Sequence, residues 1–216
     1  METDPSELLE GPKIGFKIPE VLTVEEIDRI ISAVDMDKKE GQRNRAILET
    51  LYSCGLRVSE LCNLKLSDLY FEEGFIKVEG KGSKQRLVPI SPRAIKEIKY
   101  WLTDRNLGKI KKGYEDYVFL ARWGNNISRI MVFHMIKELA EKTGITKNIS
   151  PHTFRHSFAT HLLEGGANLR AIQCMLGHES IATTEIYTHI DRNMLRSEII
   201  EHHPRNIKYR KERGIY

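Results

Sequence analysis

Six residues along the chain have side chains that can act together on an anion such as a phosphate. They are two arginines, a lysine, two histidines and a tyrosine: Arg57, Lys81, His152, Arg155, His178 and Tyr187. Guanidinium, ammonium and imidazole groups neutralise negative charge, and a tyrosine phenol becomes a nucleophile once it loses its proton. Taken singly, each has an ordinary interpretation as a solvated cation, a structural hydrogen-bond donor or a packed aromatic ring. Their joint pattern is what carries information.

The six residues lie in short motifs that follow one another along the chain. In order, the motifs are Gly-Leu-Arg-x-Ser-Glu (55–60), Gly-Lys-Gly (80–82), His-x-x-Arg (152–155), Leu-Gly-His (176–178) and Ile-Tyr-Thr-His (186–189). His152 and Arg155 are three apart in a predicted helix, so both should project from one face. His152 and His156 also have the i, i+4 spacing of metal-binding histidines, but no Glu follows His152 as in the His-Glu-x-x-His motif.

Capping signals predict the helices that must position these motifs. Thr23-x-x-Glu26 is a capping box, Ser91-Pro92 and Ser150-Pro151 pair an N-cap with a proline at the first helical position, and Ser128 is a further N-cap. With glycines as stop signals, the expected helices start near position 23 and then span about 43–52, 58–64, 92–102, 128–143, 151–164, 168–175 and 191–202. Pro204 should break the last helix, leaving a basic tail.

Two apolar-rich runs, 75–78 and 86–89, flank a basic tip that contains two glycines, which predicts a β-hairpin carrying Lys81. We therefore expect an α+β fold, mainly α-helical with a small antiparallel β-sheet. The expected organisation is an arm or linker over 1–18, a catalytic domain over 19–205 and a basic C-terminal tail over 206–216.

Composition is that of an ordinary globular chain. Among 216 residues, 40% are hydrophobic and 30% charged, and the net charge of +4 is compatible with a nucleic-acid partner. The three cysteines suggest neither a disulfide framework nor a zinc site. The chain has no run long enough to span a membrane, and its polar, acidic start is unlike a signal peptide, so the expected compartment is the cytoplasm.

The ordered motifs resemble those of the tyrosine recombinases, within the phage integrase family, and are most similar to the Xer group that resolves chromosome dimers. The resemblance covers about 19–205 and rests on 55–61, 150–156 and 176–189. It implies the tyrosine recombinase catalytic-domain fold, with the six residues above as the catalytic set and Glu60 as support for Arg57. It also implies strand cleavage and rejoining through a 3′-phosphotyrosyl intermediate. A phage or mobile-element integrase and a type IB topoisomerase-like strand transferase remain alternatives, as does a DNA-binding module without activity.

Physical chemistry suggests a role for each residue in such a reaction. Arg57 and Arg155, with His178, would neutralise the phosphate; His152 would accept the proton of Tyr187; Lys81 would protonate the leaving 5′-hydroxyl. No metal or cofactor is expected, and the chain has no ATP-binding P-loop motif. The expected partners are a double-stranded DNA recombination site, recombinase subunits in a homo- or hetero-tetramer, and a DNA translocase as a candidate activator.

Family members normally carry an N-terminal helical domain, so we expect either a piece of a longer protein or an unusually short member. The helix from Ser128, with Arg129, His134 and Lys137, is a candidate major-groove element or an ordinary solvated helix.

Overall fold

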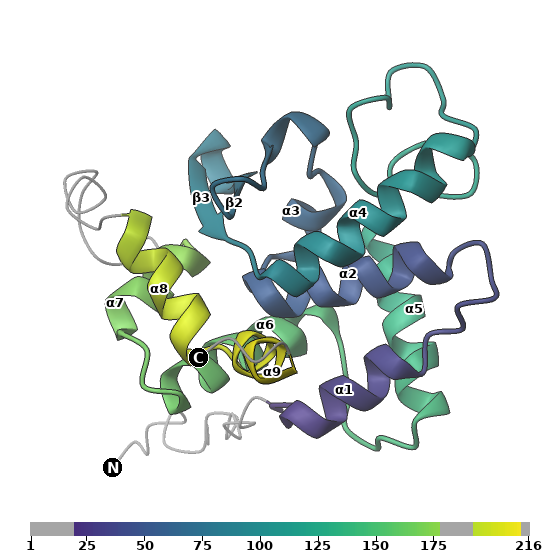
Figure 1. The fold of residues 1–216 in the computed structure, drawn as a ribbon. Helices are drawn as coiled ribbons and strands as arrows, with labels where there is room; N and C mark the ends of the chain where they lie inside the picture. The colour runs from purple at the N-terminus through teal and green to yellow at the C-terminus, as the bar shows by residue number, and fades with distance from the viewer. Residues whose placement is uncertain (1–19, 178–191, 213–216) are drawn as a thin grey trace, which may run out of the picture.

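The fold is built around α2 (Gly41–Cys54), a helix that is buried on almost every side. Eleven of its 14 residues are buried, as expected for a helix that packs against neighbours all round rather than facing water. Helices α4 (Pro92–Leu107) and α6 (Pro151–Glu164) pack against it. Figure 1 shows α4 in front of α2, with the strands at one end of the assembly and α1 and α5 at the other.

The computed structural model describes residues 20–177 and 192–212. The remaining elements there, in chain order, are α1 (Val24–Ser32), α3 (Val58–Cys62), the short 3-10 turn η2 (Leu66–Asp68), β1 (Leu69–Tyr70), β2 (Phe75–Glu79), the 3-10 turn η3 (Lys81–Ser83), β3 (Gln85–Pro89), α5 (Arg129–Lys142), α7 (Leu169–Leu176), α8 (Arg192–His202) and α9 (Pro204–Glu212). The expected fold class, mainly helical with a small antiparallel sheet, is confirmed. No helix within these ranges is both long and apolar enough to cross a membrane.

The predicted helix starts are confirmed by the side chains that cap them. Thr23 accepts a hydrogen bond from the Glu26 amide, and the Glu26 carboxylate accepts one from the Thr23 amide in return. Ser91 and Ser128 each accept from an amide in the first turn of the helix that follows. Gly55 ends α2 in the left-handed conformation, where a Cβ would also strike the Phe158 ring.

The sheet has the order β1-β2-β3 and is antiparallel throughout. The predicted hairpin is β2–β3, paired from Phe75 with Pro89 to Glu79 with Gln85. The two-residue strand β1 was not predicted, because so short a segment has no measurable alternation. Helix α4 also runs five residues past its predicted end at Leu102.

The last predicted helix does end before Pro204, since α8 ends at His202, but the prediction of a basic tail after it is wrong. Pro204 starts α9 instead, because proline has the backbone angle and the missing N–H that suit a first helical position. Arg205 in this helix is 2% exposed and pairs with Asp28 of α1 and Glu49 of α2. The basic residues of 206–212 therefore belong to a helix packed on the domain rather than to a solvated tail.

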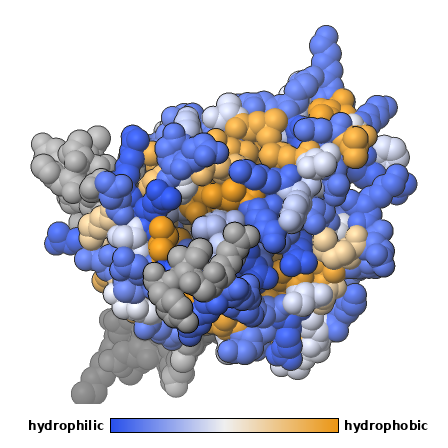
Figure 2. All heavy atoms as spheres, viewed as in Figure 1, coloured by the Kyte–Doolittle hydropathy of each residue, from blue (hydrophilic) through white to orange (hydrophobic). Residues whose placement is uncertain are grey.

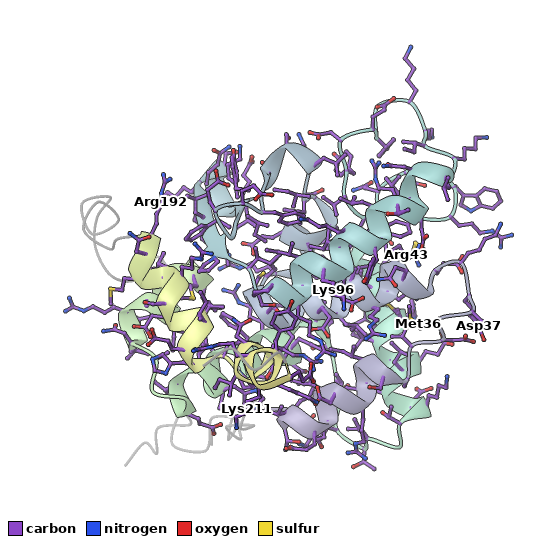
Figure 3. All side chains as sticks on the ribbon, in the orientation of Figure 1. Met36, Asp37, Arg43, Lys96, Arg192 and Lys211 are labelled. Carbon is purple, nitrogen blue, oxygen red and sulfur yellow. The ribbon has the colours of Figure 1, made fainter. Side chains whose placement is uncertain are left out.

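The exterior agrees with the charged composition. Figure 2 shows hydrophilic side chains over most of this face, with apolar patches between them. In Figure 3, Met36 and Asp37 lie at the periphery, between α1 and α2, whereas Arg43 points into the fold. Arg43 is 6% exposed and donates a hydrogen bond to the Leu120 carbonyl oxygen.

Candidate active site

Arg57 is the first residue of the candidate site, and Glu60 fixes its position. Arg57 is the N-cap of α3, and Glu60, one turn later, accepts hydrogen bonds from the Arg57 amide at 2.8 Å and from Nη1 at 3.0 Å. The Glu60 side chain is 2% exposed, whereas 37% of the Arg57 side chain is exposed. Arg57 is thus held from its buried side and keeps an accessible one, as a residue that receives an anion must.

Arg86 of β3 also binds Glu60, and the sequence analysis did not predict it as a site residue. Its Nη1 and Nη2 donate to the two Glu60 oxygens at 2.7 and 2.9 Å, and its Nε donates to the Met175 carbonyl at 2.8 Å. Arg86 therefore joins the hairpin to α3 and to the end of α7. The available sequence signal was an arginine inside an otherwise apolar strand, opposite Val78.

Arg155 of α6 lies close enough to Arg57, Glu60 and Arg86 to interact with their charges. It is 8% exposed, and it donates from Nη1 to the Gly55 carbonyl at 2.7 Å and from Nη2 to the Leu176 carbonyl at 2.6 Å. These bonds attach it to the end of α2 and to the end of α7. The expectation that His152 and Arg155 share one face is only partly met, since His152 is exposed while Arg155 points into the protein.

The cluster of Arg57, Glu60, Arg86 and Arg155 is strongly cationic. Burial, and then the positive charge of Arg57, lower the pKa of Arg155 to about 10, so it stays protonated at neutral pH. Burial alone would raise the pKa of Glu60, but hydrogen bonds from Arg86 and Arg57 lower it overall, so it stays ionised. Three guanidinium groups against one carboxylate leave an excess of positive charge, and this excess suits an anionic ligand.

The predicted hairpin brings Lys81 to this cluster by its backbone position. A Cβ placed on Gly80 would lie 3.5 Å from Arg86 Nη1 and 3.8 Å from Glu60 Oε1, so the chain entering η3 runs directly beside the cluster. Lys81 is the next residue. The hairpin tip is therefore adjacent to Arg57 through Glu60, as the assignment of Lys81 to the site requires.

His178 and Tyr187 lie outside the described residues. Both flanks of their segment are described, and both lie beside the sheet. On one side Gly177 ends α7 in the left-handed conformation, where a Cβ would meet Arg86 at 3.2 Å. On the other side, Arg196 of α8 approaches Gly74, which precedes β2. The catalytic assignments of His178, Tyr187, Lys81 and His152 remain predictions, as do those of Arg57, Arg155 and Glu60.

The other catalytic possibility raised by the sequence was a histidine metal site. His152 and His156 are both exposed on α6. Within residues 20–177 and 192–212, no three His, Cys, Asp or Glu side chains come together in a way that could hold a metal ion.

Comparisons with known proteins identify the family. The model of the phage integrase family matches residues 20–194. The chain belongs to the phage integrase family. It is 44% identical over 202 residues to the tyrosine recombinase XerD of Staphylococcus saprophyticus, covering 94% of this chain and 68% of that protein. The corresponding identity to XerD of Staphylococcus aureus is 43% over 202 residues.

Solved structures give the same result for the fold. The crystal structure of the XerA recombinase is 36% identical, with a TM-score of 0.69, over 87% of this chain and 66% of that one. The XerH site-specific recombinase, solved with its difH substrate before cleavage, is 30% identical with a TM-score of 0.67, over 80% of this chain and 51% of that one. The chain is thus a Xer-like tyrosine recombinase, and it spans about half to two thirds of the length of these relatives.

Proposed function

We propose that this chain cleaves and rejoins DNA strands in site-specific recombination, with Tyr187 as the nucleophile. The observation that carries the proposal is the buried Arg57–Glu60–Arg86–Arg155 cluster, in which one accessible and two buried guanidinium groups surround a single carboxylate. A DNA phosphodiester is an anion, and attack on it adds negative charge to its non-bridging oxygens. Fixed cations that need no reorganisation stabilise such a transition state most effectively.

Each site residue has a distinct task in this mechanism. Arg57 and Arg155, with His178, bind the non-bridging oxygens, while Glu60 and Arg86 hold Arg57 in place. Removal of one donor to a developing oxyanion costs about 3–4 kcal/mol of barrier. Arg155 also donates to the Gly55 and Leu176 carbonyl oxygens, which supports the proposal because it ties this cation to the ends of α2 and α7.

Proton transfer accompanies the attack. The Tyr187 phenol gives its proton to His152 as its oxygen bonds to phosphorus, and the bond from phosphorus to the 5′-oxygen breaks. Lys81 protonates that oxygen, which leaves as a free 5′-hydroxyl. The products are a 3′-phosphotyrosine and a 5′-hydroxyl, so one phosphoester bond replaces another, and rejoining needs neither ATP nor a metal ion.

The partner is double-stranded DNA, and α5 offers a face for it. Its first two turns expose Arg129 and His134 together with the large apolar side chains of Ile130 and Phe133, which are 68% and 38% exposed. Large apolar groups exposed among basic ones favour a binding face over an ordinary solvated helix. The recombining assembly is a homo- or hetero-tetramer of recombinase subunits on two DNA sites, with a DNA translocase as a candidate activator.

The biological role that fits best is Xer-like resolution of chromosome dimers in the cytoplasm, in support of chromosome partition before cell division. It is suggested by the identity to the XerD proteins, which exceeds that to the structurally similar integrases. DNA integration is the second candidate. A transposon integrase from Tn1549, solved with circular intermediate DNA, is 27% identical with a TM-score of 0.64.

A supercoiled plasmid carrying two copies of the host chromosome's recombination site tests the proposal. In excess EDTA, we expect the chain to exchange the sites and to release a circle whose length is set by their spacing. A plasmid without the sites is the control and should be unchanged. Relaxation of both plasmids would instead indicate a topoisomerase, and a reaction that depends on added Mg²⁺ would contradict the metal-free mechanism.

A further inference from the structure

The turn that precedes α5, residues 121–126, displays an exposed tryptophan. Trp123 is 77% exposed, and the Arg122 guanidinium lies 5.8 Å from its ring centroid. The chain has two tryptophans. The other, Trp101, is 7% exposed, and its Nε1 donates to the Val118 carbonyl. A large ring that faces water beside a cation marks a surface suited to a partner.

Hydrogen bonds hold the backbone of the turn in a defined conformation. The Ala121 amide donates to the Asn125 carbonyl, and the Lys111 amide donates to the Gly124 carbonyl. Gly124 has a φ of 81°, and a Cβ there would strike the Lys109 carbonyl, so glycine is required. Arg43 anchors the start of the turn at the Leu120 carbonyl. Trp123 therefore projects from a turn whose backbone is held by several hydrogen bonds.

The surroundings of Trp123 are basic. Lys109, Lys111 and Arg122 are all exposed on or next to the turn. The two acidic residues between Lys111 and the turn already accept hydrogen bonds: Glu115 from the Gly113 amide, and Asp116 from the amide and hydroxyl of Ser67. A patch of an apolar ring and several cations complements a polyanion that also has apolar surface, as nucleic acid does.

The turn is connected to the candidate active site through α3. Asn126 donates a long hydrogen bond, 3.4 Å, to the carbonyl of Cys62, the last residue of α3. Arg57 lies at the other end of that helix. Five residues of helix span about 7.5 Å, so Asn126, at the end of the turn, lies near the candidate active site.

We propose that the 121–126 turn is a second DNA contact, distinct from α5, in which Trp123 packs against the deoxyribose edge of the duplex. Arg122 and the neighbouring lysines bind the flanking phosphates. Base pairs in a duplex are stacked on one another, so the ring meets sugar edges in the minor groove more readily than base faces. This inference rests on the proposed function, because it takes DNA bound at Arg57 as its reference point.

Trp123→Phe and Trp123→Ala test the contact, in the full chain, with a fluorescently labelled mixed-sequence duplex of about 30 base pairs, roughly three helical turns. We expect duplex DNA to quench wild-type tryptophan fluorescence over the concentration range in which anisotropy reports binding. Trp123→Phe should bind within about 3-fold of wild type but lose the quenching, and Trp123→Ala should bind about 10-fold more weakly. Arg122→Ala should lower the salt dependence of binding by about one released ion.

Tyr100→Ala is the matched control. Tyr100 of α4 is 53% exposed and has the Lys96 amine 5.6 Å from its ring centroid, so it is a second exposed cation–ring pair. Its loss should leave DNA affinity unchanged. The inference is overturned if Trp123→Ala binds as wild type does, or if it changes only the sedimentation of the protein, which would make the turn a contact between protein chains. Failure of the proposed function looks different: the wild-type chain would then form no covalent adduct with a nicked duplex.

Discussion

At the scale of single residues, Arg86 is the group on which the candidate site depends most and which the motifs did not reveal. Its three donors contact Glu60 of α3 and the carbonyl of Met175 in α7, while its own strand belongs to the hairpin of Lys81. Since Glu60 in turn accepts a hydrogen bond from Arg57, Arg86 would act on a bound phosphate only through Glu60 and Arg57. It is a positioning residue.

Arg86→Gln and Glu60→Gln are expected to slow single-turnover adduct formation by about 100-fold each, while DNA affinity changes by less than about 3-fold. Because both residues act through Arg57, the double variant should be hardly slower than either single one. Arg86→Lys, which keeps the charge but not the bidentate geometry, should recover part of the rate. Rapid-quench kinetics at saturating DNA measure this.

Gln85→Ala serves as the control for the strand, since Gln85 is the exposed neighbour of Arg86 on β3. It should react at the wild-type rate. If the rate reductions of the two single variants multiplied in the double variant, Arg86 would not act through Glu60.

Lys81 is the residue for which the hairpin matters most. We expect Lys81→Ala to slow cleavage strongly, and a substrate with sulfur at the 5′-bridging position to restore most of the rate. The reason is that a thiolate leaves without being protonated, whereas an alkoxide needs an acid. Adduct yields on matched oxygen and sulfur substrates measure the effect. If sulfur gave no rescue, Lys81 would be stabilising charge or the fold rather than donating a proton.

The sequence predicted the residues with distinctive neighbours and missed those defined by partners far along the chain. Arg57 and Arg155 are found in local motifs, and the structure brings both to the same carboxylate-bearing cluster. Arg86 binds partners 26 and 89 positions away, and no local pattern encodes such separations.

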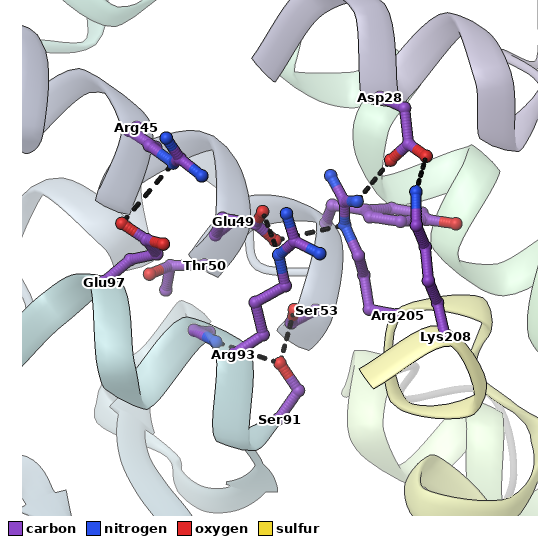
Figure 4. Close-up of polar contacts among 12 residues, drawn as sticks. Asp28, Arg45, Glu49, Thr50, Ser53, Ser91, Arg93, Glu97, Arg205 and Lys208 are labelled. Carbon is purple, nitrogen blue, oxygen red and sulfur yellow. Dashed lines mark hydrogen bonds and ion pairs between the residues drawn. The ribbon is translucent and has the colours of Figure 1, made fainter. Parts of the chain in front are cut away.

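At the scale of elements, the position of α9 depends on a buried network of charges. Arg205 forms an ion pair with Asp28 (Figure 4). Its Nε also lies 3.1 Å from Glu49 Oε2, without the geometry of a hydrogen bond. The Nε atom of Arg93 donates a hydrogen bond to Glu49 Oε1 at 3.0 Å. Glu49 is fully buried, and burial raises its pKa even though Arg205 and Arg93 act to lower it. The network ties α9 to α1, α2 and α4.

Arg205→Ala should destabilise the chain by about 3–5 kcal/mol, because it leaves the buried Glu49 carboxylate undercompensated. Replacing both partners, as Glu49→Gln with Arg205→Met, should cost less than Arg205→Ala alone. Urea unfolding measures both.

The control is Lys208→Ala. Lys208 also pairs with Asp28, but 49% of its side chain is exposed, so its loss should cost less than about 1 kcal/mol. Equal losses for Arg205 and Lys208 would mean that burial of the network has no energetic consequence.

His203, at the corner between α8 and α9, makes stability depend on pH. Burial lowers its pKa to about 3 from an ordinary 6.5. Below pH 6.5 the unfolded chain therefore takes up a proton that the folded chain does not, so stability is lost as pH falls toward 3. At pH 5.5 this group alone should cost about 1.4 kcal/mol relative to pH 7.5.

His203→Asn should flatten the decrease in unfolding free energy between pH 7.5 and 5.5 by about that amount. His156→Asn, which alters an exposed histidine of α6, is the control and should leave the decrease as it is. If the unfolding free energy of His203→Asn fell with pH as steeply as that of the wild type, the His203 ring would not be the buried neutral group that causes the decrease.

Element boundaries were predictable where a side chain marks them. The capping residues Thr23, Ser91 and Ser128 were confirmed, as was the stop at Gly55. Helix α9 was missed because its cations resemble a tail in sequence, and their buried partner Glu49 lies more than 150 positions away.

At the scale of the whole molecule, five separate segments converge on one cationic cluster. They are the end of α2, α3, the hairpin, α6 and the end of α7. Helix α8 carries four apolar residues at helical spacing, Met194, Leu195, Ile199 and Ile200. Ile199 is 1% exposed and Leu195 also packs on the core, whereas Met194 is 36% exposed, so in the single chain only part of this apolar face is covered by its own domain.

Much of the general architecture could be predicted from the sequence because capping residues, stop glycines and apolar runs are local signals. Relative placement could not, since it follows from contacts such as Arg155 with Gly55, 100 positions apart. The approach of the 121–126 turn to α3 is a further example.

In the proposed mechanism, Tyr187 attacks a phosphate held by the arginine cluster. The most direct measurement traps the covalent intermediate on a nicked duplex from which the 5′-hydroxyl fragment diffuses away, and then maps the DNA-linked peptide by mass spectrometry. We predict one adduct, at Tyr187, formed in EDTA, absent from Tyr187→Phe, and reduced in Arg57→Ala, while Tyr187→Phe still binds the duplex. An adduct that maps to another residue, or one that persists in Tyr187→Phe, would show that Tyr187 is not the nucleophile.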